Sequence, residues 1–305
     1  MRKILAIQGS DLKKVNIKTD TTFLLASEAQ KRGYSVYYFE PKNMSFLNGR
    51  VIAYCKQIKI NNGKKKFYSV LKTLSFNLEK SKTILIRNDP PFDNRYFYST
   101  FLLDYISNKV KIINHPFAIR NVSEKLFSIN LMKYMPPTLI SENLKEIKKF
   151  FRKYNLVIAK PINSFSGNNV ILLKKFNSKK ITRLLKTHNH IFFQKFLPEV
   201  YKGDKRIFII KGKIVGAISR VPKKGSILSN MSKGAHAKLT KLTKKEIKIS
   251  KIVGKLLVKN NIFFAGIDFV NEKLIGDINV TSPTGLTTHK DLTGKNLANL
   301  FWKWI

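Results

Sequence analysis

Two oxygen-bearing side chains lie close together near the end of the chain, in the segment LIGDINVTSPT (residues 274–284). The apolar residues around them predict a β-strand, so Asp277 and Asn279, two positions apart, share one face. A second predicted strand, GIDFV (residues 266–270), carries Asp268. Carboxylate and amide oxygens suit a hard cation such as Mg²⁺. A solvent-exposed acidic face on an edge hairpin explains the same three residues equally well.

The turn between these two strands decides how the two carboxylates face each other. If the turn is Glu272 and Lys273, Asp268 lies directly opposite Asp277, and like charges in that position are unfavourable without a compensating cation. This register is conditional, because NEKL is not a strong hairpin-turn sequence.

A proline-rich loop is a second candidate binding element. The predicted strand 84–87 runs into RNDPPFD (residues 87–93), where two prolines prevent the strand or a helix from continuing. Ligands of open α/β sheets bind at the carboxyl ends of strands, which favours a binding loop. The alternative is a rigid surface turn in which Asp93 caps the next helix.

The charge of the chain is extreme. Its 305 residues include 58 Lys and Arg against 18 Asp and Glu, a net charge of +40, and 43% of them are hydrophobic, as in a globular protein. The lysines are dispersed and accompany no zinc finger or RNA-binding motif, so we expect no specific nucleic-acid partner. The same charge favours small anionic substrates such as phosphates and carboxylates.

Cysteine and hydropathy patterns predict a cytoplasmic protein without a membrane partner. Cys55 is the only cysteine, which excludes an internal disulfide or a cysteine-based zinc site. The opening MRKILAIQG has too short an apolar run for a signal sequence, and no stretch approaches membrane-spanning length. The histidines show no metal-binding spacing; they are His115, His188, His190, His236 and His289.

The first part of the chain reads as a βαβ unit. Predicted strands at residues 3–8 and 36–40 flank a helix that Asp20 caps and Gly33 ends. The loop 9–19 lacks the GxGxxG pattern of dinucleotide-binding folds, so a nicotinamide enzyme is disfavoured. Further strands are expected at 84–87 and 110–114. We expect this first unit to end near residue 120.

The second part alternates predicted strands with loops. Strands at 156–160 and 170–173 enclose the loop 161–169, and a hairpin is expected at 206–218 around Lys211 and Gly212. Residues 221–238 are polar and poorly periodic, which is typical of a mobile functional loop.

Five strings, in this order and at this spacing, resemble the prokaryotic glutathione synthetases, members of the ATP-grasp superfamily. They are NIKTDTTF (16–23), RNDPPFD (87–93), SEKLF (123–127), GDKR (203–206) and INVTSPTG (278–285). The resemblance runs nearly end to end. It implies an α/β protein with a Rossmann-like N-terminal pre-ATP-grasp domain (1–120) that binds substrate, followed by a two-sheet ATP-grasp domain (121–305).

The resemblance also implies an activity and its residues. Such an enzyme joins γ-glutamylcysteine to glycine through an acyl phosphate, consuming ATP with Mg²⁺, or Mn²⁺ in its place. Implied nucleotide-binding residues are Lys125, Lys160, Gly167, Gln194, Lys195, Phe196, Leu197 and Asp204. Implied metal ligands are Asp268, Asp277 and Asn279. Arg206 and Arg220 would meet the substrate carboxylate and acyl phosphate, and Asp20, Arg87, Asp89 and Ser282 the dipeptide. Family members are commonly tetramers.

Several positions depart from the family pattern. Asp277 replaces the usual Glu, Asn88 a lysine, and Leu228 and Thr287 stand where arginines are expected, while the loop after Lys160 keeps one glycine. Two alternatives therefore stay open: an ATP-grasp ligase with a different acceptor, and a noncatalytic anion- or nucleic-acid-binding relative.

Overall fold

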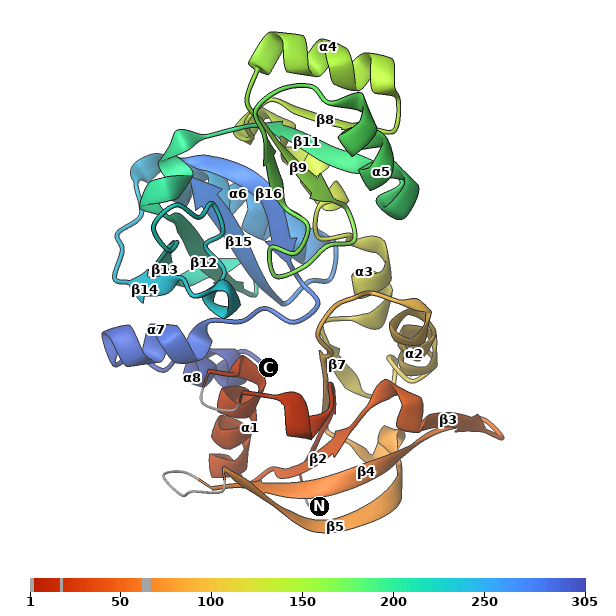
Figure 1. Ribbon diagram of the computed structural model, residues 1–305. Coiled ribbons are helices and arrows are strands. Elements are labelled where there is room, and N and C mark those ends of the chain that lie inside the picture. Colours follow the sequence, from red (N-terminus) through yellow and green to blue (C-terminus); the bar gives the residue numbers. More distant parts are fainter. Residues whose placement is uncertain (1–2, 17–18, 62–66) are drawn as a thin grey trace.

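Three β-sheets form the framework of the protein. The computed structural model describes residues 3–16, 19–61 and 67–305, and places a seven-stranded, a four-stranded and a five-stranded sheet around one another (Figure 1). Ile17 and Lys18, within the string NIKTDTTF, lie outside the described residues. In the described part of the chain, no helix has both the length and the apolar character needed to cross a bilayer.

The predicted βαβ unit is confirmed in the first sheet. Its parallel strands are β1 (Ile4–Gly9), β2 (Ser35–Phe39), β6 (Thr83–Arg87) and β7 (Lys111–Ile113). The Asp20 carboxylate accepts a hydrogen bond from the Phe23 amide at 3.0 Å and so caps α1 (Thr21–Lys31). Leu5 and Ile7 pack on the side of α1, and Ala6 between them packs on the opposite side.

Three antiparallel strands extend this sheet, and the sequence patterns did not predict them. They are β3 (Met44–Leu47), β4 (Arg50–Ile60) and β5 (Tyr68–Asn77). β4 alternates, with Val51, Ala53 and Cys55 buried, but half of β5 is solvent-exposed and only Phe76 in it is buried. An exposed edge strand needs few apolar residues, so its sequence carries little periodic signal. Helices α2 (Asn94–Tyr105) and α3 (Pro116–Asn121) cover the face opposite α1.

The two remaining sheets are antiparallel. The four-stranded sheet holds β8 (Thr138–Ser141), β9 (Val157–Pro161), β10 (Ile171–Leu173) and β11 (Ile191–Lys195), with α4 (Leu144–Tyr154) and α5 (Ser178–His188). The five-stranded sheet holds β12 (Asp204–Ile210), β13 (Lys213–Val221), β14 (His236–Lys238), β15 (Phe264–Val270) and β16 (Lys273–Asn279), with α6 (Lys244–Lys259). The predicted hairpin around Lys211 and Gly212 is confirmed.

Residues 221–238 begin and end in β-strands, which was not predicted. Val221 pairs with His236, so both ends of the segment belong to the five-stranded sheet and only its middle is a loop. The expectation of one continuous loop is therefore wrong, because β14 is only three residues long and too short to show a strand pattern.

The C-terminal helices return to the first sheet. Helices α7 (Leu286–Thr293) and α8 (Leu297–Lys303) pack near α1 (Figure 1), where Phe301 and Trp302 join its core. The Trp302 indole N–H donates to the Leu25 carbonyl at 2.8 Å. The C-terminal helix α8 and the first strand β1 therefore contribute side chains to the same hydrophobic core.

Asn114 ties the first sheet to the five-stranded sheet. Its side-chain oxygen accepts from the Phe263 and Phe264 amides at 2.9 and 2.8 Å, and its side-chain nitrogen donates to the Phe264 and Val280 carbonyls at 2.8 and 2.7 Å. The residue is 3% exposed, so each of these groups lacks a ready replacement from water.

We therefore expect Asn114→Ala to lower the free energy of unfolding by about 3 kcal/mol, because buried backbone groups lose their partners. Urea denaturation followed by circular dichroism measures the change. The matched control is Asn94→Ala at an exposed position, where a change within about 0.5 kcal/mol is expected. Equal effects of the two substitutions would contradict this role of Asn114.

Candidate active site

One cavity of about 710 Å³ gathers nearly all the residues that the sequence nominated. Strands of the four- and five-stranded sheets and the loops between them form most of its wall, and loops of the first sheet close one side. The nominated residues in its lining are Asp20, Asp89, Lys125, Lys160, Gly167, Gln194, Lys195, Phe196, Leu197, Asp204, Arg206, Arg220, Asp268, Asp277, Asn279 and Ser282. Arg87 is the exception.

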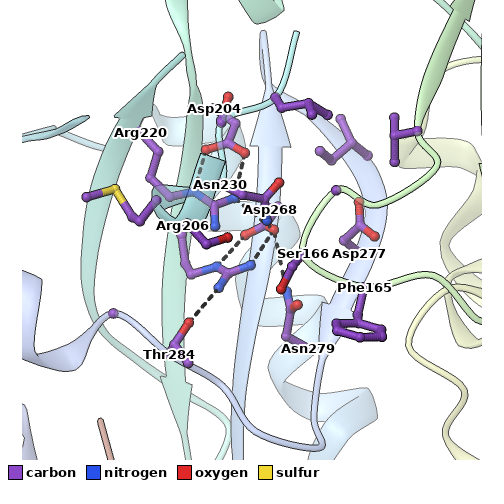
Figure 2. A pocket seen from close by; sticks show the side chains of 18 of the residues that line it. Phe165, Ser166, Asp204, Arg206, Arg220, Asn230, Asp268, Asp277, Asn279 and Thr284 are labelled. Carbon is purple, nitrogen blue, oxygen red and sulfur yellow. Dashed lines mark hydrogen bonds and ion pairs between the residues drawn. The ribbon is translucent and has the colours of Figure 1, made fainter. Parts of the chain in front are cut away.

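Four buried charges form a network on the cavity wall (Figure 2). The Arg206 guanidinium donates to both carboxylate oxygens of Asp268, at 2.8 Å from Nε and 2.7 Å from Nη2. The Arg220 guanidinium donates in the same way to both oxygens of Asp204, at 2.8 and 2.5 Å. Arg220 also reaches Asp268 at 3.0 Å. Burial opposes ionisation of Asp268, but the two guanidinium groups hold the pKa of that carboxyl well below its usual range.

The hairpin register differs from the predicted one. The turn is Asn271 and Glu272, both with positive φ, so Val270 pairs with Lys273, and a bulge follows in the ladder. Asp268 has no ladder partner on β16 and instead lies opposite Arg206 on β12. The predicted direct Asp268–Asp277 pairing is therefore wrong. An arginine on the other neighbouring strand compensates the charge of Asp268.

Asp277 forms a separate cluster with two lysines. Its carboxylate lies 3.5 Å from the Lys160 ammonium and 4.0 Å from that of Lys125. Lys160 also donates to the Ile275 carbonyl at 2.8 Å. The lysine side chains are 9% and 6% exposed and that of Asp277 29%, so Asp277 is the member that faces the open cavity.

The pKa of Lys125 is lower than that of an ordinary lysine. Burial disfavours its charged form, and the proximity of Lys160 acts in the same direction. The carboxylates of Asp277 and Glu124 oppose this effect without cancelling it. An anionic ligand that approached Lys125 would favour its charged form.

Asp277 and Asn279 share a face of β16, as predicted: both line the cavity, and Ile278 between them is fully buried. The Asn279 amide nitrogen donates to the Gly266 carbonyl at 3.1 Å and lies 3.4 Å from an Asp268 oxygen. Asn279 therefore links the ion network to the strand that carries Asp277.

Two loops meet across the cavity. Gly167 has a φ of +72°, and a Cβ at this position would lie 2.7 Å from the Asn230 side-chain oxygen and 3.2 Å from Leu228. Any larger residue would push the loops apart. Figure 2 shows Ser166 and Asn230 on the cavity side of these loops. Neither residue was nominated from the sequence, because their place depends on this contact.

Arg87 lies behind the cavity wall. It is 5% exposed, and its guanidinium donates to the Thr22 hydroxyl at 3.1 Å and the Pro283 carbonyl at 2.9 Å. Nearby, the Ser282 hydroxyl lies 3.4 Å from the Arg87 carbonyl. Arg87 thus joins the first sheet to the loop that carries Ser282.

The proline loop has both of the features that the sequence left open, a residue in the cavity and a helix cap. Asp89 lines the cavity and accepts a hydrogen bond from the Ser10 hydroxyl at 3.1 Å. Asp93 caps α2 by accepting from the Tyr96 amide at 2.8 Å, as the structural alternative predicted.

Glu124 is a cavity residue that sequence reasoning did not nominate. One of its oxygens accepts from the Val280 amide at 2.9 Å, the Thr281 amide at 3.1 Å and the Thr281 hydroxyl at 2.9 Å. It therefore fixes the backbone that follows Asn279. The sequence feature that could have indicated Glu124 is its position next to Lys125 in the string SEKLF.

The departures from the family pattern have definite places. Leu228 lines the cavity, whereas the Thr287 hydroxyl donates to the Asp20 carbonyl at 3.2 Å beside it. Asn88 is 8% exposed and lies outside the lining. Of the three, only Leu228 can meet a ligand directly.

Comparison with solved structures supports the fold. The structure of the D-cycloserine synthetase DcsG superposes with a TM-score of 0.68 at 13% sequence identity, covering 99% of this chain and 100% of the other. The ATP-grasp ligase PsnB, complexed with minimal precursor, Mg and ADP, gives a TM-score of 0.61 at 13% identity, with 98% and 97% covered.

Sequence comparison is more specific. The family model for the prokaryotic glutathione synthetase N-terminal domain matches residues 4–120, and that for the ATP-grasp domain of the same enzymes matches residues 124–294. Glutathione synthetase of Bradyrhizobium diazoefficiens is 36% identical over 309 residues, spanning 100% of this chain and 98% of its own. The protein therefore belongs to the prokaryotic glutathione synthetase family, with its N-terminal α/β domain and its ATP-grasp domain.

Proposed function

We propose that this protein is an ATP-dependent carboxylate–amine ligase that joins γ-glutamylcysteine to glycine, forming glutathione, ADP and phosphate. The observation that carries the proposal is the convergence of Lys125, Lys160 and Asp277 in a single cavity of a chain that matches glutathione synthetases over its whole length. The substrate carboxylate would first accept the γ-phosphoryl group, and the amine of glycine would then displace phosphate from the acyl phosphate.

The two buried lysines suit the phosphates of ATP. Both ammonium groups lie within 4.0 Å of the Asp277 carboxylate at the open cavity, and backbone carbonyls hold each of them in place, so an incoming phosphate would meet positive charge without reorganising the wall. Gln194 and the residues through Leu197 at the end of β11 line the same cavity and offer backbone groups and an apolar slot for adenine. Gly167 and Lys195 extend this nucleotide side.

The residues also fit a bound Mg²⁺. Asp268, Asp277 and Asn279 bring carboxylate and amide oxygens to one cavity, which is the donor chemistry that Mg²⁺ prefers. No cluster of three or more His, Cys, Asp or Glu side chains suited to a metal occurs among residues 3–16, 19–61 and 67–305, so Asn279 and ligand oxygens would complete the set. When bound with ATP, Mg²⁺ would neutralise phosphate charge. Mn²⁺ could substitute for it.

Arg206 and Arg220 would stabilise the substrate carboxylate and the acyl phosphate. Their carboxylate partners fix the plane of each guanidinium group before substrate binds, and both line the cavity. A pre-oriented donor loses less entropy when an anion arrives. Asp204 therefore acts on substrate through Arg220.

The first sheet would supply the dipeptide side of the site. Asp20, Asp89 and Ser282 line the cavity next to the loops that Arg87 holds in place. Their carboxylate and hydroxyl groups suit the amino and amide groups of γ-glutamylcysteine. Leu228, in place of the expected arginine, favours a second candidate, a ligase of the same mechanism with a different acceptor.

A coupled assay of phosphate release from Mg·ATP tests the function. We expect release only when γ-glutamylcysteine and glycine are both present, with glutathione formed in equal amount, and loss of release when Mg²⁺ is chelated. Full activity with another amine and little with glycine would show that this other amine, and not glycine, is the acceptor. Absence of release with every pair, from folded protein that binds ATP, would contradict the ligase.

Asp277→Ala should lower kcat by about 100-fold or more, because the two buried lysines and the proposed Mg²⁺ lose their shared carboxylate. The urea midpoint should change little, since Asp277 faces the open cavity. Asp277→Glu should keep part of the activity. The control Asp291→Ala removes an exposed carboxylate on α7 and should leave kcat unchanged. Normal turnover by Asp277→Ala would remove this residue from the site.

Binding of Mg·ADP should weaken at alkaline pH before the ordinary lysine pKa of 10.5 is reached, because Lys125 loses its proton earlier than an exposed lysine. Isothermal titration calorimetry over that pH range measures the effect. Lys125→Arg should bind with much less pH dependence, since a guanidinium stays protonated. The control Lys195→Arg, at an exposed position of the same cavity, should keep the pH dependence of the unmodified protein. Identical pH profiles for Lys125→Arg and the unmodified protein would contradict this role.

A further inference from the structure

Glu124 has one carboxylate oxygen that is fully used in hydrogen bonds and one that is not. Its Oε1 accepts three hydrogen bonds from the Val280 amide and from the amide and hydroxyl of Thr281. The Glu124 carbonyl also accepts from the Ile278 amide at 2.9 Å, so the residue is fixed to the end of β16 at two points. Its Oε2 accepts no hydrogen bond from the residues that the structure describes. Because Glu124 lines the cavity, this second oxygen is available to a ligand.

Ion pairs divide the carboxylates of the cavity lining into two groups. One group is paired with arginine or lysine side chains and consists of Asp204, Asp268 and Asp277. The other group forms no ion pair within the described part of the chain and consists of Asp20, Asp89 and Glu124. Burial lowers the pKa of Lys125, and the Asp277 and Glu124 carboxylates oppose this effect. Glu124 is therefore the unpaired carboxylate beside a lysine that we assign to the phosphates of ATP.

The proposed reaction would bring two ammonium groups into this cavity. One is the α-ammonium of the γ-glutamyl residue, at the end of the dipeptide remote from the carboxylate that is activated. The other belongs to glycine and must lie beside the acyl phosphate, because its nitrogen forms the new bond. Asp20 and Asp89 come from the first sheet and suit the remote ammonium. Glu124, next to Lys125 in the chain, suits the ammonium at the reacting end.

We propose that Glu124 is a catalytic residue that binds the ammonium group of the acceptor through Oε2 and takes a proton from it; this inference rests on the function proposed above. When the bond between the glycine nitrogen and the carbonyl carbon forms, the bond from that carbon to the phosphate oxygen breaks. The nitrogen changes from an ammonium to an amide N–H and releases two protons. The departing phosphate takes one of them and Oε2 takes the other. Oε1 keeps its hydrogen bonds, so the carboxyl group stays in place throughout the step.

Hydroxylamine separates formation of the acyl phosphate from use of the acceptor. It is uncharged at neutral pH, so it needs no ammonium-binding carboxylate, and its single surplus proton leaves with phosphate. Glu124→Gln keeps an oxygen for Val280 and Thr281 but removes the negative charge. This variant should form hydroxamate from γ-glutamylcysteine, Mg·ATP and hydroxylamine within about 2-fold of the wild type. Its kcat/KM for glycine should fall by about 100-fold or more.

Two matched amide substitutions serve as controls. Asp89→Asn, on the dipeptide side, should raise KM for γ-glutamylcysteine and leave KM for glycine unchanged. Glu146→Gln, at an exposed position on α4, should change neither constant. The urea midpoint of Glu124→Gln should stay close to that of the wild type, because the hydrogen bonds to residues 280 and 281 are retained.

The assays distinguish failure of this inference from failure of the proposed function. Equal losses of hydroxamate and glutathione formation in Glu124→Gln would overturn the inference, since Glu124 would then only support the backbone after β16. A raised KM for γ-glutamylcysteine alone would also overturn it, by placing the α-ammonium of the dipeptide at this carboxylate. Wild-type protein that forms neither hydroxamate nor glutathione would contradict the ligase itself.

Discussion

Neutralisation of buried charge is the constraint on which the active-site region depends. Asp204, Arg206, Arg220 and Asp268 are each less than a tenth exposed, and one unpaired member in this position would destabilise the fold by several kcal/mol. Their pairing locks β12, β13 and β15 in register, because Asp204–Arg220 and Arg206–Asp268 join adjacent strands and Arg220–Asp268 reaches across β12. The same pairing holds the guanidinium groups ready for an anionic substrate.

The second charge cluster obeys the same constraint with a different outcome. Lys125 and Lys160 come from separate segments and share Asp277, which stays partly exposed. A phosphate that entered the cavity beside the partly exposed Asp277 would meet both ammonium groups. The four-residue network is fully paired and buried, whereas the cluster around Asp277 stays open to the cavity and is the phosphate site that we propose.

The first sheet is joined to this region by hydrogen bonds at a few points. Asn114 bonds to the backbone of β15 and to Val280, Arg87 bonds to Pro283, and the Thr21 hydroxyl accepts from the Gly285 and Leu286 amides at 3.1 and 3.2 Å. These contacts align the loops of the first sheet with the end of β16. A dipeptide and a nucleotide bound on the two sides would therefore meet in one cavity.

The sequence by itself determined the βαβ opening, the hairpin around Lys211 and Gly212, the family, and a set of candidate residues of which all but Arg87 line one cavity, because these depend on local periodicity and on motifs in fixed order. It did not yield β3, β4 and β5, the register of Asp268, the place of Arg87 behind the wall, or the roles of Glu124 and Asn230. Only the tertiary structure decided these. A strand edge, a bulge and a loop contact depend on which distant backbone lies alongside, and residues such as Asp268 and Arg206, 62 positions apart, become neighbours only when the sheet forms.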